Sequence, residues 1–216
     1  MKQTNFFLLT VIAIVVIQLC ITYYVMNRTN NPNINIALIF ILSIITVIIL
    51  TTFHENIPTT VQLALFTFFS YLFGLMFYQV KQREQYSNEV INEVILSTIS
   101  VFVSMAIIGS VLLSFGIQLG FKAWIILFVG LLSLILSRII LIFTAVNPEN
   151  IDKLTTQHKL LSTIGIFLFS GYVIYDTNVI LQGTYYKKNE YTRAALSYYL
   201  DFINIFSNKL SLITNP

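Results

Sequence analysis

The sequence predicts an all-α protein, a polytopic membrane helical bundle, and three observations predict it. Of the 216 residues, 56% are hydrophobic and only 10% are charged, whereas a soluble domain carries about 25% charged residues. Long apolar runs recur, each close to the about 20 residues that a helix needs to cross the hydrocarbon core. The separators are short and rich in Asn, Pro, Lys, Arg and Glu, as turns are. We therefore expect an integral, multi-pass membrane protein.

Seven apolar runs are long enough, or nearly so, to span a bilayer. They lie at residues 5–26, 35–53, 59–80, 92–115, 121–145, 160–182 and 194–213. A transmembrane β-barrel needs strands of about 10 residues with alternating polarity, and these runs are longer and continuous. We therefore predict seven transmembrane helices in a single domain over residues 1–216. The last run is the least hydrophobic, so it either crosses the membrane or re-enters on the side where it began.

The first apolar run, the distribution of charge and the single cysteine narrow the possible classes of protein further. The run lacks the small-residue cleavage pattern of a signal peptide, so we expect a retained helix. Lys and Arg are divided almost equally between the two expected sides, so the sequence predicts no orientation. The net charge of +3 is spread over the separators without a basic run, so nucleic-acid binding is not expected. The lone Cys20 excludes an intrachain disulfide.

Two aspartates lie well inside apolar runs. Asp176 interrupts YVIYDTNVIL, residues 172–181, and Asp201 interrupts ALSYYLDFINIF, residues 195–206. An ionised carboxylate at the centre of a membrane helix costs about 2.5–3.5 kcal/mol on insertion scales, so such a residue is expected to face a bundle interior or a wet cavity. Two carboxylates that meet there share a proton and titrate as a unit. Deprotonated, they offer the oxygen ligands that Ca²⁺ prefers. We predict that Asp176 and Asp201 form a pH sensor and ion gate that binds Ca²⁺; the alternative is a structural hydrogen-bonded pair.

Other polar residues recur at helical spacing near the aspartates. In the last run Ser197, Asp201, Asn204 and Asn208 fall at i, i+4, i+7 and i+11. The predicted pore-lining residues are Ser197, Asn204, Asn208, Tyr172, Ser100 and Ser104. The alternative for the hydroxylated residues is ordinary helix packing, because small side chains let membrane helices approach closely.

Two basic residues are candidates to contact the aspartates. Arg138 is a third charge within an apolar run, and it either pairs with an aspartate or extends to the membrane interface. His54 ends the second run beside Glu55; the alternative for His54 is a solvated loop histidine.

Three segments resemble the Bax inhibitor family, the transmembrane Bax-inhibitor-motif group that includes viral Golgi anti-apoptotic and Lifeguard-type proteins. The sequences FSGYVIYDTNVI at 169–180 and AALSYYLDFINIF at 194–206 resemble its paired C-terminal signatures, and LALFTFFSYLFG at 63–74 is similar to its third helix. The resemblance implies a seven-helix bundle with the last helix central. It also implies a pH-sensitive Ca²⁺ leak in which Asp176 and Asp201 are the sensor, and a role in suppressing cell death.

The sequence departs from the family pattern at two places. Members often carry a basic residue near the end of the second helix that latches onto the aspartates, but TTFHENIP at 51–58 contains no Arg or Lys. His54 or Arg138 is the candidate latch instead. The usual basic C-terminal tail has no counterpart in the last residues, so regulation by such a tail is not expected.

The resulting functional hypothesis is a Ca²⁺ leak channel associated with inhibition of apoptosis. We expect it in the endoplasmic reticulum or Golgi of a eukaryotic or virus-infected cell, or in a bacterial plasma membrane. The expected partners are the lipid bilayer, Ca²⁺, protons, and either cell-death regulators or a second copy of the chain, with no cofactor. The alternative is a non-conducting membrane protein that suppresses cell death by binding partners.

An enzyme is not expected. Tyr175-Asp176 is similar to the Tyr-Asp pair of intramembrane aspartyl proteases, which hold two aspartates around a water. However, Asp201 follows Tyr199-Leu200, not the Gly-x-Gly of those proteases. A seven-helix receptor is also disfavoured, because the short separators leave little room for a ligand vestibule.

Overall fold

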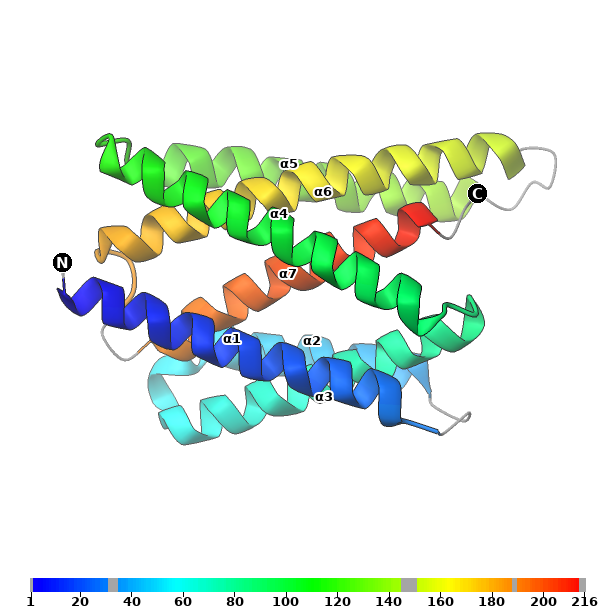
Figure 1. The fold of residues 1–216 in the computed structure, drawn as a ribbon, viewed down its shortest axis with the longest axis horizontal. Coiled ribbons are helices and arrows are strands. Elements are labelled where there is room, and N and C mark those ends of the chain that lie inside the picture. The colour runs from blue at the N-terminus through cyan, green and yellow to red at the C-terminus, as the bar shows by residue number, and fades with distance from the viewer. Residues whose placement is uncertain (1, 31–34, 145–150, 188–189, 214–216) are drawn as a thin grey trace. The chain divides into compact units, whose positions relative to one another are not determined.

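The computed structural model describes residues 2–30, 35–144, 151–187 and 190–213, and these residues form helices and no strands (Figure 1). The helices are α1 (Lys2–Arg28), α2 (Ile36–Thr52), the short 3-10 helix η1 (His54–Asn56), α3 (Thr59–Arg83), α4 (Asn88–Ser114), α5 (Phe121–Thr144), α6 (Ile151–Gln182) and α7 (Tyr191–Ile213). The predicted all-α class is confirmed, and each of the seven apolar runs corresponds to one α-helix.

The largest difference from the predicted boundaries is at the start of α6. The apolar run predicts a beginning at residue 160, whereas the helix begins at Ile151. Residues 151–159 are polar but contain no Gly or Pro, so nothing in them opposes helix formation. With 32 residues, α6 is about 48 Å long at 1.5 Å per residue, longer than the about 30 Å of the hydrocarbon core.

Five helices are long and apolar enough to cross a membrane, namely α1, α3, α4, α5 and α6. The apolar α2 is shorter, with 17 residues, and α7 is more polar than the other helices because it carries Asp201, Asn204 and Asn208. Ile213 is the only exposed residue of α7, and Asp201 and Asn208 are buried. The chain is a multi-pass integral membrane protein.

Contacts between Cα atoms divide the chain into two compact units. Unit 1 comprises Met1–Ser87 and Tyr186–Tyr199, and unit 2 comprises Asn88–Tyr185 and Leu200–Pro216. The division falls inside α7, between Tyr199 and Leu200. The single domain over residues 1–216 stays a prediction.

In unit 1, α3 packs against both α1 and α2. Gly74 makes the approach of α1 and α3 close, because a Cβ at this position would lie 2.6 Å from the Cβ of Val25 and 2.9 Å from the carbonyl oxygen of Thr22. The first part of α7 contributes Tyr199, whose ring lies edge-on to Phe66 at 5.3 Å between centroids. Glycine at a helix contact is the usual means of close packing in membranes.

In unit 2, α6 packs against α4 and α5. The apolar core contains Leu134, Phe169, Val173 and Ile205. The connection between α4 and α5 is held by the buried Asn178 of α6, whose amide contacts the backbone of three residues. Its Nδ2 donates to the carbonyl oxygens of Gly109 (3.1 Å) and Ile117 (3.0 Å), and its Oδ1 accepts from the amide of Leu119 (2.8 Å).

Candidate functional site

The two aspartates predicted as the sensor lie in the same unit. Asp176 is near the end of α6 and Asp201 is in the middle of α7, and their exposed fractions are 6% and 5%. Both belong to unit 2. Each carboxyl group lies within electrostatic range of the other, and the hydroxyl of Tyr172 lies within range of both. The α6–α7 contact of unit 2 therefore gathers two acidic groups and one phenol in a buried place.

The carboxyl group of Asp201 is incompletely satisfied. Its Oδ2 atom is buried and accepts no hydrogen bond from the described residues. A buried polar atom without a partner costs about 1–3 kcal/mol, and more when it is charged. A buried polar group that is left unsatisfied calls for an explanation, and a functional role is one that a membrane carboxylate commonly has.

The two helices that carry the aspartates also contribute to the apolar core of unit 2. The core of Leu134, Phe169, Val173 and Ile205 is extended by the ring of Phe102, which packs on Phe202 with 5.9 Å between centroids. Two ionised carboxylates that lie close together in a buried place are unfavourable. A shared proton or a bound cation would relieve that repulsion.

Polar contacts continue along α7 beyond Asp201. Asn204 donates from Nδ2 to the carbonyl oxygen of Leu200 at 2.8 Å, and Asn208 donates to the carbonyl oxygen of Asn204 at 2.7 Å. The Oδ1 atom of Asn208 accepts a short hydrogen bond from Arg138 of α5. A Cβ at Gly165 of α6 would overlap the Asn208 amide, so the glycine makes room for it.

The two candidate latch residues have other contacts. Half-buried Arg138 donates to Asn208. The His54 ring lies in unit 1, where Nδ1 contacts the carbonyl oxygen of Thr51 at 2.9 Å and Nε2 lies 3.3 Å from Oε1 of Glu190. These are the contacts that the structure gives for the two side chains, and the latch stays a prediction.

The remaining predicted pore-lining residues divide into two kinds. Ser100 and Ser104 are exposed on α4, and their hydroxyls donate to the carbonyl oxygens of Leu96 (2.9 Å) and Ser100 (2.7 Å) in the same helix. Ser197 is half-buried and belongs to the part of α7 in unit 1. Serines that bond their own helix are as expected for packing positions, and a pore-lining role stays a prediction for all three.

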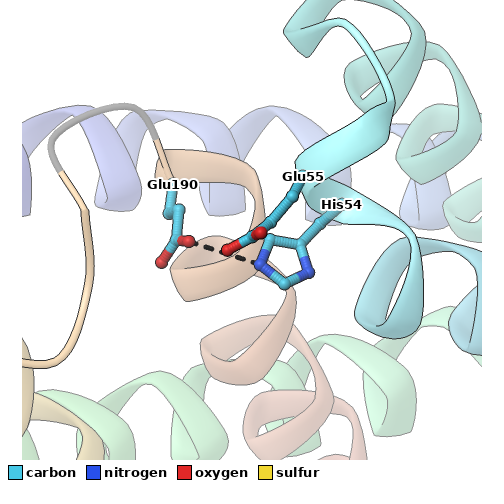
Figure 2. Close-up of side chains that lie close together, drawn as sticks. All are labelled: His54, Glu55 and Glu190. Atoms are coloured by element: carbon cyan, nitrogen blue, oxygen red, sulfur yellow. Dashed lines mark ion pairs between the residues drawn. The ribbon is translucent and has the colours of Figure 1, made fainter.

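A second cluster of titratable side chains lies in unit 1, at the ends of helices. His54 and Glu55 of η1 meet Glu190, which precedes α7 (Figure 2). One potential ligand atom from each residue lies within 4.8 Å of the other two. Figure 2 shows the three side chains pointing toward one another.

Two cations border this second cluster. Lys187 pairs with the Glu55 carboxylate through a short contact, and Arg193 lies 3.7 Å from Glu190. The hydrogen bond and the charge of the Lys187 ammonium lower the pKa of Glu55, and the same contact raises the pKa of Lys187. The cluster therefore contains ionised groups of both signs.

Sequence reasoning missed this cluster and the buried contact in unit 1 between the hydroxyls of Thr22 and Tyr199, which lie 2.6 Å apart. It gave neither Glu190 nor Tyr199 a functional role. Glu190 and His54 are far apart in the chain, so no spacing pattern connects them. The only local signal for Tyr199 is its position two residues before Asp201 within the second family signature.

Comparisons with known proteins identify a family and several relatives. Residues 3–215 match the family described as "Inhibitor of apoptosis-promoting Bax1". Over 87 residues the chain is 31% identical to an uncharacterized membrane protein of Vibrio cholerae, covering 40% of this chain and 34% of that one. Over 78 residues it is 37% identical to Protein LIFEGUARD 1 of Arabidopsis thaliana, covering 36% and 32%. Over 87 residues it is 37% identical to the Golgi anti-apoptotic protein of Vaccinia virus, covering 40% and 32%. The chain spans about a third of the length of these curated relatives.

Proposed function

Because this chain belongs to the Bax inhibitor family, as its two aspartate motifs predict, we propose that it modulates cell death from within a membrane, as a pH-sensitive Ca²⁺ leak. One relative carries the name Golgi anti-apoptotic protein, from Vaccinia virus, which supports the part of the proposal that concerns cell death. The name supports an internal membrane of the Golgi or endoplasmic reticulum as the place of action in a eukaryotic or infected cell. A bacterial member would act in the plasma membrane.

The observation that carries the proposal is the buried acidic pair. Asp176 and Asp201 lie within electrostatic range of each other in unit 2, and Oδ2 of Asp201 has no hydrogen-bond partner among the described residues. A folded membrane protein keeps such a costly pair where it serves a purpose. Carboxylate oxygens are the ligands that Ca²⁺ prefers.

The proposed mechanism is a change of charge at one place in the bundle. When the pair shares a proton, one negative charge is neutralised and the two groups can stay together. Loss of that proton leaves two like charges, which either separate or bind a cation. Proton and Ca²⁺ therefore compete for the same oxygens and bias the packing of α6 and α7 toward a closed or an open arrangement. No catalytic step and no cofactor belong to this function.

The test is Ca²⁺ flux into liposomes that contain the purified protein, measured over a pH series. The wild type is expected to conduct Ca²⁺ with a rate that depends on pH. The double variant Asp176→Asn/Asp201→Asn keeps the size of both side chains but cannot titrate, so its flux is expected to fall to the background of protein-free liposomes. The control is Glu93→Gln, an exposed carboxylate of α4, which is expected to leave the flux unchanged. Equal flux and equal pH dependence in the double variant would disprove the leak.

The alternative of a non-conducting protein is separated by a second measurement. Cells that express the double variant are challenged with an apoptotic stimulus. Loss of protection together with loss of flux supports the leak as the route to cell-death control. Full protection without flux means that the protein acts by binding cell-death regulators or a second copy of itself.

A further inference from the structure

The orientation of His54 poses a problem that a proton or a cation must solve. Its Nδ1 lies 2.9 Å from the carbonyl oxygen of Thr51, and because a carbonyl oxygen only accepts, Nδ1 is the nitrogen that carries hydrogen in the neutral ring. Its Nε2 is buried and has no hydrogen-bond partner among the described residues, yet it lies 3.3 Å from Oε1 of Glu190. A neutral ring thus directs a lone pair at a carboxylate oxygen, which also only accepts.

The separation of these two atoms fits two ligands of one metal ion. Bonds from Zn²⁺ to histidine nitrogen and carboxylate oxygen are about 2.0–2.2 Å long, and in a tetrahedral site they place neighbouring ligand atoms about 3.3–3.6 Å apart. The observed distance between Nε2 of His54 and Oε1 of Glu190 is 3.3 Å. The third candidate, Glu55, offers a carboxylate oxygen within 4.8 Å of both. Because its side chain is 60% exposed, its carboxylate has room to move toward the other two ligand atoms.

His54 and Glu190, the two less exposed ligands, each have a second contact to the backbone, as ligands in metal sites do. A metal-bound histidine usually donates its other N–H to a carbonyl or carboxylate oxygen, and a metal-bound carboxylate is itself hydrogen-bonded. Here Nδ1 of His54 meets Thr51, and Oε2 of Glu190 accepts from the backbone amide of Lys187 at 3.1 Å. These contacts leave Nε2 and Oε1 as the atoms that face each other (Figure 2).

We propose that His54, Glu55 and Glu190 bind a divalent transition-metal ion of the zinc type. One imidazole and two carboxylates suit such an ion, whereas Ca²⁺ prefers oxygen ligands alone. The ion ties η1 to the start of α7 within unit 1. This site is separate from the aspartate pair, and its existence does not depend on the Ca²⁺ leak.

Lys187 is the competitor for this site. Its ammonium pairs with Glu55 and must leave when the metal binds, and its 65% exposed side chain has water to move into. The proposal therefore predicts opposite effects for neighbouring residues, since loss of a ligand weakens metal binding whereas loss of Lys187 strengthens it.

The test is a titration of the purified protein in detergent with Zn²⁺ at neutral pH, in competition with a chromophoric zinc indicator. The wild type is expected to bind one Zn²⁺ per chain. His54→Gln and Glu190→Gln are each expected to weaken binding by at least about tenfold, the scale of losses around metal sites. Glu55→Gln is expected to weaken binding as well. Because the Glu55 side chain is 60% exposed, this substitution is expected to leave the fold intact. Lys187→Gln is expected to bind Zn²⁺ more tightly.

The matched control is His158→Gln. His158 is the other histidine of the chain and is exposed on α6, so its replacement is expected to leave the affinity unchanged. A wild type that binds no Zn²⁺, or a His54→Gln protein that binds it as tightly as the wild type, would overturn the proposal. In that case the contact between His54 and Glu190 is an ion pair of imidazolium and carboxylate. Loss of Ca²⁺ flux in the aspartate variants has no bearing on this result.

Discussion

Two buried polar residues of α7, Tyr199 in unit 1 and Asp201 in unit 2, differ in how their side chains are hydrogen-bonded. In unit 1, Tyr199 is fully buried, and its hydroxyl lies 2.6 Å from Oγ1 of Thr22. In unit 2, Asp201 is almost as deeply buried, but its Oδ2 has no hydrogen-bond partner among the described residues. The two residues are separated by Leu200 alone. Two positions apart, one helix thus carries a neutral group with a hydrogen-bond partner and an acidic group with one oxygen that lacks a partner.

The difference between these two residues concerns the free energy of burying a polar group. A hydrogen bond such as that of Tyr199 contributes about 1 kcal/mol, whereas an unpartnered buried acceptor costs about 1–3 kcal/mol. Asn178 follows the pattern of Tyr199, because its side chain makes four hydrogen bonds. Asp201 differs from both residues, and it is the acidic residue whose buried oxygen lacks a partner among the described residues, which is why the proposed function rests on it.

Asp201→Asn has the largest expected effect. It tests whether Asp201 differs from Tyr199 in serving function and not stability. The amide cannot exchange a proton, so we expect Ca²⁺ flux in liposomes to fall to background and its pH dependence to disappear. We expect the free energy of unfolding to stay the same or to rise, since an acidic group is removed from apolar surroundings. Denaturant titration in detergent micelles measures the second quantity. A strong loss of stability would make Asp201 a structural residue like Tyr199.

Asn178→Ala is the matching substitution at a satisfied group of unit 2. It leaves the amide of Leu119 and the carbonyl oxygen of Ile117 without the partners that hold the α4–α5 connection. We expect a loss of about 3 kcal/mol in the free energy of unfolding, measured by the same titration. Gln118→Ala, at an exposed residue of the same connection, is the control and is expected to change little. Equal effects of the two substitutions would contradict the anchoring role.

Gly165→Ala tests the hydrogen bond between Asn208, in the second part of α7, and Arg138. The added Cβ displaces the Asn208 amide and breaks its hydrogen bond with Arg138. We expect a loss of about 2 kcal/mol, because a hydrogen bond to a charged group is removed, and the midpoint of thermal unfolding in detergent reports it. In Gly120→Ala the new Cβ meets no atom within 4 Å, so that variant is expected to unfold like the wild type. A neutral Gly165→Ala would mean that the Asn208 amide moves at no cost.

Tyr199→Phe has the smallest expected effect. Thr22 keeps its contact with the carbonyl oxygen of Ser70 (3.0 Å), so no group is left without a partner. We expect a loss of about 1 kcal/mol in the denaturant titration, with Ca²⁺ flux unchanged. Tyr24→Phe, which removes an exposed hydroxyl on α1, serves as the control. Loss of flux without loss of stability would mean that Tyr199 has a functional role, as we propose for Asp201.

The sequence alone determined the class and the helices of this protein. Composition identified a membrane protein, and each apolar run became a helix, because a backbone in lipid must satisfy its hydrogen bonds locally. The burial of Asp176 and Asp201 also follows from local sequence, since an aspartate inside an apolar run has few acceptable environments. The start of α6 was predicted too late, because hydropathy marks the limit of the apolar segment and not the residue at which the helix begins.

Only the tertiary structure decided which polar groups are satisfied. The contacts of Arg138 with Asn208 and of His54 with Glu190 join residues far apart in the chain, and they depend on how each helix is rotated against its neighbour. Spacing along one helix fixes which side chains share a face, but it does not fix what that face meets. The unpartnered oxygen of Asp201 and the facing atoms of His54 and Glu190 therefore could not be predicted from the sequence, because packing between segments decides them.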